Sequence, residues 1–275
     1  KEFGNKEFII SPNNKSHYLT YQDLEMSLSG LERLLNKNYV AEQEAIGVIL
    51  PNCNSMAALF LLIPALNRIF VPINIKGSKS EIKYLIKNSN IKLIFKKTGL
   101  NDLSFPKIPT IEVDIEDEIW IKNKFLSKGQ LNLNQKFNKD NIAEIVYTSG
   151  STGKPKGVQL SHENLISNSL SIAKSFSFEQ KDKFLTLTPL FHNSGQIFTT
   201  LAPIWGGSST IPVRPEIGLI AFWDLIHGNS ITWTLGMGSH IYFLLSNDIE
   251  VKNNHSLKGI LVGGMKLNNR KREQF

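Results

Sequence analysis

The stretch from Tyr147 to His162, YTSGSTGKPKGVQLSH, decides the fold of this chain. It follows the apolar run IAEIVYTS, which predicts a strand, and it leads into SHENLISNSLSIAKSF, which predicts a helix that begins near Ser161. Glycines let the backbone approach a ligand closely, while hydroxyl groups and lysines supply donors and positive charge, so this composition predicts a phosphate-binding loop. The glycines are Gly150, Gly153 and Gly157, the hydroxyl residues Thr148, Ser149, Ser151 and Thr152, and the cations Lys154 and Lys156.

This loop differs from the phosphate loop of the P-loop NTPases. That motif has the spacing G-x-x-x-x-G-K-[ST]. Counted from Gly150, the sixth position is Pro155, and the pair Gly153-Lys154 is followed by proline rather than by serine or threonine. The sequence therefore disfavours a P-loop NTPase.

Predicted helices and strands alternate along the chain. This order predicts an α/β fold with mixed, largely parallel sheets covered by helices. Residues 99 to 140 show no regular pattern. Strands are predicted at 45–50, 69–74, 91–95, 142–149, 184–188, 209–213, 231–235 and 257–264, and helices at 20–37, 56–66, 78–89, 161–176, 196–205, 216–229 and 239–247.

The composition excludes several classes of protein. Of the 275 residues, 41% are hydrophobic, enough for a large core. Cys53 is the single cysteine, which excludes a disulfide framework within the chain and favours a reducing, cytoplasmic location. The start, KEFGNKEFII, lacks the features of a signal peptide, and the longest apolar run, Met56 to Leu66, is too short to span a bilayer.

The net charge is +7, and seven lysines lie between Lys76 and Lys97 against the single acid Glu81. We interpret this cluster as a solvated surface rather than as a site for a polyanion. Tyr84 and Phe95 are the only aromatic residues nearby, whereas nucleic-acid binders often add several for base stacking. No nucleic-acid partner is expected.

Several motifs together resemble the adenylate-forming superfamily, which includes acyl- and aryl-CoA synthetases, firefly luciferase and the adenylation domains of peptide synthetases. YTSGSTGKPKGV resembles the signature loop of that family, and the resemblance extends over about residues 18 to 268. Asn67 and Arg68 depart from it, because a small Ala-Gly-like pair is usual there. The other matching segments are LTYQDL, AIGVILPNCNSMAALFLLIPALNRIFVPIN, TPLFHNSG and LKGILVGGMKL.

The resemblance implies a set of site residues. Lys156 and His192 would be catalytic, and PLFHNSG follows the acyl/aryl-CoA ligase form of its motif. No protein ligand for a metal is expected in this chain. The ATP phosphates would be bound by Thr148, Ser149, Gly150, Ser151, Thr152, Gly153 and Lys156, and the acyl pocket and adenine would be lined by His192, Asn193, Gly236, Met237, Gly238, Gly263, Gly264 and Met265.

The activity implied by the resemblance has two steps. A small-molecule carboxylate would attack MgATP to form an acyl-adenylate, and the thiol of coenzyme A would then take the acyl group, as in fatty acid metabolism. The cofactors implied are ATP, Mg²⁺ and coenzyme A as substrate. The alternatives are a fatty-acyl-AMP ligase, a luciferase-like oxidase, an amino-acid adenylation module, or a non-catalytic nucleotide-binding remnant.

We expect the chain to be a truncated N-terminal adenylation domain without the C-terminal domain, and so not fully active alone. One subdomain would comprise about residues 1–70 and 183–275, and the other about 71–182 with the phosphate loop at 147–157. The sequence predicts neither the acyl substrate nor the oligomeric state.

Overall fold

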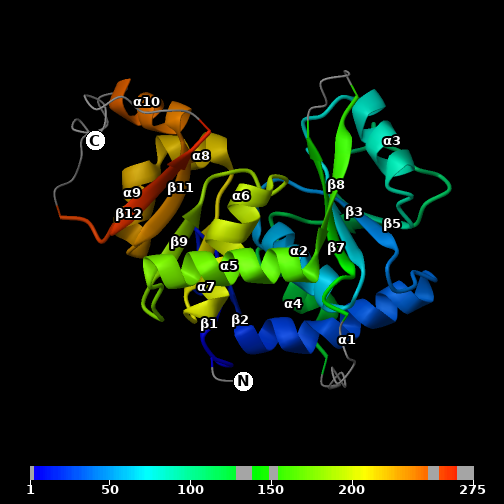
Figure 1. Cartoon of the computed structure of the whole chain (residues 1–275), viewed down its shortest axis with the longest axis horizontal. Helices are drawn as coiled ribbons and strands as arrows, with labels where there is room; N and C mark the ends of the chain where they lie inside the picture. Colours follow the sequence, from blue (N-terminus) through cyan, green and yellow to red (C-terminus); the bar gives the residue numbers. More distant parts are fainter. Residues whose placement is uncertain (1–2, 128–137, 149–153, 247–253, 265–275) are drawn as a thin grey trace.

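The protein forms two six-stranded sheets with helices between and around them (Figure 1). The computed structural model describes residues 3–127, 138–148, 154–246 and 254–264. Both sheets are parallel except for one antiparallel pair at an end of each. The predicted fold class is therefore confirmed.

The first sheet joins the two ends of the described chain. Its strand order is β12-β11-β9-β10-β1-β2, so the N-terminal hairpin lies beside strands from the second half of the sequence. Ile9 is the register partner of Thr210. The strands are β1 (Glu7–Ile10), β2 (Tyr18–Thr20), β9 (Lys183–Thr186), β10 (Ser209–Pro212), β11 (Trp233–Met237) and β12 (Gly259–Gly263).

The second sheet is built from the middle of the chain. Its order is β6-β5-β3-β4-β7-β8, and β7 and β8 form its antiparallel pair. Because β3, β4, β5, β6 and β7 are parallel, their carboxyl ends lie at the same edge of the sheet. The strands are β3 (Ala45–Ile49), β4 (Ile69–Pro72), β5 (Leu93–Lys97), β6 (Thr110–Val113), β7 (Ile142–Thr148) and β8 (Lys156–Ser161).

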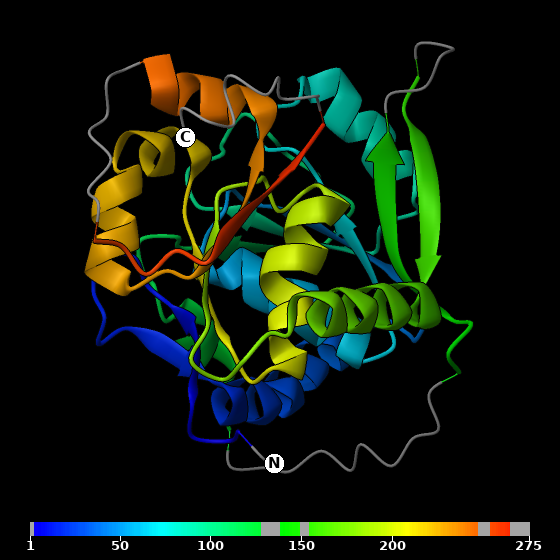
Figure 2. The same ribbon diagram turned by 60° about the vertical axis from the view of Figure 1, so that its left-hand side comes forward.

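Helices fill the space between the sheets and cover their outer faces (Figure 2). The central helix α2 contacts strands of both sheets, and ten of its twelve residues are buried. No helix among the described residues combines the length and apolar character needed to cross a membrane. The helices are α1 (Tyr21–Lys37), α2 (Asn54–Ala65), α3 (Lys79–Asn88), α4 (Trp120–Phe125), α5 (His162–Phe176), α6 (Asn193–Gln196), the π-helical turn η1 (Ile197–Leu201), α7 (Ala202–Trp205), α8 (Pro215–Ile220), α9 (Phe222–Asn229) and α10 (Gly238–Ser246).

Local sequence signals explain where several helices begin. Thr20 caps α1 in a capping box with Asp23, and Ser161 caps α5, which begins where the sequence predicts a helix. Ser78 caps α3 by accepting a hydrogen bond from the backbone N–H of Glu81. Asn67 adopts a φ of 57°, a left-handed conformation that favours glycine or asparagine, which explains why asparagine is tolerated there.

The structure also contains elements that the sequence patterns did not predict. These are the hairpin β1–β2, the strand β6 and helix α4 within residues 99–140, and the strand β8 between the glycine-rich loop and α5. The helix predicted at 216–229 is divided into α8 and α9, and the one predicted at 196–205 begins three residues earlier and contains a π-helical turn.

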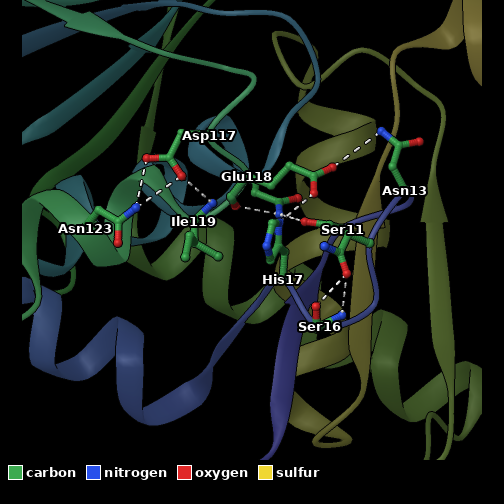
Figure 3. Close-up of polar contacts among 10 residues, drawn as sticks. Ser11, Asn13, Ser16, His17, Asp117, Glu118, Ile119 and Asn123 are labelled. Atoms are coloured by element: carbon green, nitrogen blue, oxygen red, sulfur yellow. Dashed lines mark hydrogen bonds and ion pairs between the residues drawn. The ribbon is translucent and has the colours of Figure 1, made fainter.

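Polar contacts join the N-terminal hairpin to the segment before α4 (Figure 3). Nδ1 of His17 lies 3.2 Å from Oε2 of Glu118, and Nδ2 of Asn13 donates to Oε1 of the same glutamate. The buried Asn54 donates to the Oγ of Ser11 and to the backbone carbonyl of Glu118. The first sheet is thereby tied to the connection that follows β6 of the second sheet.

The chain passes from the first sheet to the second between residues 20 and 45, and returns to the first sheet between residues 161 and 183. The boundary predicted near residue 70 falls inside β4. It would assign β3 to the first subdomain, whereas β3 and β4 pair with each other in the second sheet. We therefore propose that the first subdomain comprises the segments up to β2 and from β9 onward, and that the second begins with β3.

Candidate nucleotide and acyl site

The candidate phosphate loop lies at the exposed end of the β7–β8 hairpin. Thr148 ends β7, Lys156 begins β8, and the two are register partners with exposed side chains. Lys154 is also exposed. The predicted phosphate-binding residues Ser149, Gly150, Ser151, Thr152 and Gly153 lie outside the described residues.

Contacts to α3 hold this hairpin in place. The phenol O–H of Tyr147 donates to Oδ1 of Asn88, 2.6 Å away, and its oxygen lies 2.6 Å from the Oγ of Ser89. The phenol O–H of Tyr84 donates to the backbone carbonyl of Pro155 at 3.2 Å. The hairpin is therefore anchored to α3 through Tyr147 of β7 and through Pro155, the residue before β8.

Gly157 allows the close packing within the hairpin. A Cβ at this position would meet Cγ2 of Ile145 at 3.0 Å and the ring of Tyr147 at 3.2 Å. Any larger residue would push the Tyr147 ring away from its contacts with α3.

The second candidate segment, Pro189 to Gly195, leads from β9 into α6. His192 is exposed and immediately precedes α6, and its backbone N–H donates to the carbonyl of Pro189. Partial burial lowers the pKa of its imidazole, which favours the neutral form. Its ring lies 4.3 Å from that of Phe191.

The last residue of this segment, Gly195, packs too closely against the backbone to carry a side chain. A Cβ there would lie 2.8 Å from the backbone oxygen of Thr188 and 3.3 Å from that of Pro189. The start of α6 consequently packs directly against the backbone of Thr188 and Pro189, and this close approach requires glycine.

The buried side chain of Asn52 holds the same segment from the other side. Its Nδ2 is within hydrogen-bonding distance of the carbonyls of Thr186, Thr188 and Val213, and its Oδ1 accepts from the N–H of Leu190 at 2.7 Å. Asn52 follows β3, so one side chain of the second sheet organises the carboxyl ends of β9 and β10 in the first.

The predicted acyl-pocket residues of the C-terminal half gather at the carboxyl ends of β11 and β12. Met237 is the register partner of Gly263, and Gly236 that of Val262. A Cβ at Gly264, which has a φ of 82°, would meet Cε of Met237 at 3.5 Å. Gly238 begins α10, and Met265 lies outside the described residues.

The end of β11 is linked to the His192 segment. The hydroxyl of Thr188 donates to the carbonyl of Leu235 at 3.0 Å. Figure 1 shows α6 between the β7–β8 hairpin and the β11–β12 pair. The predicted residues that the structure describes therefore come from the end of the β7–β8 hairpin, the start of α6 and the ends of β11 and β12.

Sequence reasoning missed one titratable residue of this region, Glu144. It lies on β7, four residues before Thr148, and is completely buried. Burial raises the pKa of its carboxyl to about 8, against the opposing effect of the amides of Gln196 and Asn193. A charged residue within the apolar run IAEIV was the available signal.

Other features lie outside the predicted site. Four of the seven clustered lysines, Lys76, Lys79, Lys92 and Lys96, form ion pairs with acids, which reduces the charge that this surface offers to a polyanion. A cavity of about 320 Å³ lies beside Arg214 and Glu116 and is lined by none of the predicted residues. Among the described residues, no group of three His, Cys, Asp or Glu side chains could hold a metal ion.

Comparison with known proteins identifies a matching family and relatives that cover most of the chain. The family model described as "AMP-binding enzyme" matches residues 1–275. A sulfoacetate–CoA ligase of Cupriavidus necator is 27% identical over 257 residues, which cover 90% of this chain and 49% of that protein. Tyrocidine synthase 3 of Brevibacillus parabrevis is 26% identical over 91% of this chain and 4% of its own length.

Solved structures give the same fold. The ATP-bound MatB of Rhodopseudomonas palustris matches with a TM-score of 0.85 and 18% identity, over 98% of this chain and 54% of that one. The chain thus spans about half the length of the sulfoacetate–CoA ligase and of MatB.

Proposed function

Because the chain belongs to the AMP-binding enzyme family, we propose that its protein activates a carboxylic acid with ATP and transfers the acyl group to coenzyme A. The observation that carries this proposal is the sequence from Thr148 to Lys156, which combines glycines, hydroxyls and lysines between the exposed end of β7 and the start of β8. The CoA ligase among the relatives supports the choice of coenzyme A as acceptor.

The first step unites two anions, since the carboxylate must attack the α-phosphorus of MgATP and expel pyrophosphate. Positioned donors and cations lower this barrier by offsetting the charge of the phosphates. We assign this role to Lys156 and the hydroxyls and backbone amides of the loop, with Mg²⁺ as the counterion of ATP. In the second step the thiol of coenzyme A attacks the acyl carbonyl and AMP leaves.

The acyl group would lie near His192, Asn193 and the glycines at the ends of β11 and β12. A neutral imidazole at His192, favoured by its lowered pKa, would orient the carboxylate without forming a fixed ion pair. The single cysteine supports a reducing, cytoplasmic location for this chemistry.

Carboxylate-dependent ATP–pyrophosphate exchange tests the proposal. The complete gene product that carries this chain should exchange pyrophosphate with one class among fatty, aryl and amino acids, and coenzyme A should then consume the adenylate. MgATP binding without exchange for any carboxylate would overturn the proposal. Exchange with amino acids alone would favour the second candidate, an adenylation module, which the match to tyrocidine synthase 3 supports.

Lys156→Ala should slow this exchange about a hundredfold, because a cation at the phosphates is lost. Lys174→Ala, at an exposed position of α5, provides the matched control and should exchange at the normal rate. Equal rates for both variants would remove Lys156 from the proposed phosphate site.

A further inference from the structure

The buried acid Glu144 occupies an unusual place in the second sheet. Its register partners are Phe70 of β4 and Leu160 of β8, both apolar. Its carboxyl group is fully buried, and among the described residues it makes no ion pair. A carboxylate in such surroundings is strongly disfavoured unless it is paired or becomes neutral.

Two amide side chains of α6 lie beside this carboxyl group. They belong to Gln196 and Asn193, and both favour its charged form. Neither reaches hydrogen-bonding geometry: within the described chain, both oxygens of Glu144, the Nδ2 of Asn193 and the Oε1 of Gln196 are buried without a partner. The Nε2 of Gln196 already donates to the carbonyl of Leu190 at 2.8 Å.

These groups complement one another when the carboxyl group is protonated. Its O–H would donate to the Oε1 of Gln196, and its carbonyl oxygen would accept from the Nδ2 of Asn193, once these atoms come within hydrogen-bonding distance. An ionised carboxylate has no proton to donate, so it would leave the Oε1 of Gln196 unsatisfied.

We propose that Glu144 is a positioning residue, whose neutral carboxyl group fastens the start of α6, and with it His192, to strand β7. The same strand continues to Thr148, roughly 13 Å further along at the usual rise per residue. Glu144 thereby sets the position of the His192 segment relative to the phosphate loop. This inference rests on the proposed function only in treating these two segments as parts of one site.

The linkage between protonation and folding has a defined sign. Burial raises the pKa of Glu144 to about 8 in the folded chain, above the ordinary value of 4.5. A carboxyl group with a raised pKa contributes its full stabilisation of the fold below pH 4.5. This contribution is lost as the pH rises toward 8. Between these limits the unfolding equilibrium constant should rise tenfold per pH unit.

The titratable groups on the neighbouring elements do not produce this shift. They are Tyr147 on β7 itself, His192 before α6, Lys156 on β8, and His162, Glu163 and Lys174 on α5, while β4 carries none. No charged side chain contributes to the pKa of Glu144.

Urea unfolding of the 275-residue chain between pH 5 and 9 tests the protonation. The wild-type chain should show the tenfold rise per pH unit relative to Glu144→Gln, which keeps a neutral group of the same size. Glu112→Gln, at the partly exposed Glu112 on β6, should retain the wild-type dependence. The same pH dependence in wild type and Glu144→Gln would overturn the proposal. This comparison needs no variant that places an apolar side chain at position 144.

The imidazole NMR signals of His192, assigned by their loss in His192→Asn, test the positioning. They should shift in wild type with a second midpoint near pH 8 that Glu144→Gln lacks. At pH 6 the signals should be near those of wild type in Glu144→Gln and displaced in Glu144→Leu. Signals that are identical in all three proteins would refute the positioning role. Both measurements omit ATP and substrate, so a failure of the proposed adenylation would leave their outcome unchanged.

Discussion

The absence of a side chain at Gly195 allows α6 to pack closely against the backbone that precedes it. Gly195 leaves room for the carbonyls of Thr188 and Pro189. The space is set by backbone atoms, so rotation of a side chain cannot relieve a clash there. His192, three residues before, depends on this contact for its position.

Gly195→Ala should destabilise the chain by about 1–3 kcal/mol, because the added methyl group overlaps the Thr188 carbonyl and forces the backbone apart. Thermal unfolding of the 275-residue chain measures the loss. Gly228→Ala in α9 is the matched control, since a Cβ there meets nothing within 4 Å and alanine favours a helix. Equal losses of stability in both variants would contradict the packing argument.

At the scale of elements, the β7–β8 hairpin replaces the simple loop-to-helix connection that the sequence suggested. Residues from Lys156 to Ser161 return antiparallel along β7 before α5 begins. The loop is thereby supported by two strands instead of one, and Tyr147 and Tyr84 connect its base to α3.

Tyr147→Phe should loosen this hairpin, because the variant loses the hydrogen bonds to Asn88 and Ser89 while keeping the ring. We expect a loss of about 1 kcal/mol. Hydrogen exchange should become faster in the backbone amides of β8, with little change in the first sheet. Tyr39→Phe, at a tyrosine that is 93% exposed, supplies the comparison, and faster exchange throughout the chain would argue against a local role.

At the scale of the whole molecule, polar side chains help to join the two sheets. Asn52 reaches from the end of β3 to three carbonyls and one N–H of the first sheet. Asn54, Asn13 and His17 make the corresponding connection to the segment around Glu118 (Figure 3).

Asn52→Ala should lower the free energy of unfolding by about 3 kcal/mol, because buried carbonyls and the N–H of Leu190 lose their partner. Urea unfolding measures this loss. Asn36→Ala, at an exposed position of α1, is the control and should change stability little. A small effect at Asn52 would mean that water replaces the side chain and that this contact contributes little to joining the sheets.

Much of the fold follows from local sequence patterns. The strands around Ala45 and Ile69 are apolar runs with clear ends, and Thr20 and Ser161 mark helix starts through their capping hydroxyls. The hairpin β1–β2 was not predicted, because its strands are short and one pairs with residues far away in the sequence. β8 was missed because its glycine and polar residues resemble a continuation of the loop.

Local sequence patterns predict only part of the candidate site. Motifs indicate the phosphate loop and the His192 segment, since each is contiguous. The environment of Glu144 depends on α6, which is about fifty residues later in the chain, so no local pattern reports it. The same holds for Asn52, whose partners lie more than a hundred residues away.

The strand order of the first sheet has a consequence for synthesis on the ribosome. β1 pairs with β10, which is translated about 200 residues later, or on the order of 10–40 s at common elongation rates. Every strand of the second sheet emerges before β9 does. The nascent chain can therefore complete its second sheet while β1 still presents an unpaired edge, and a chaperone that shields residues 7–20 during this interval should raise the yield of folded protein.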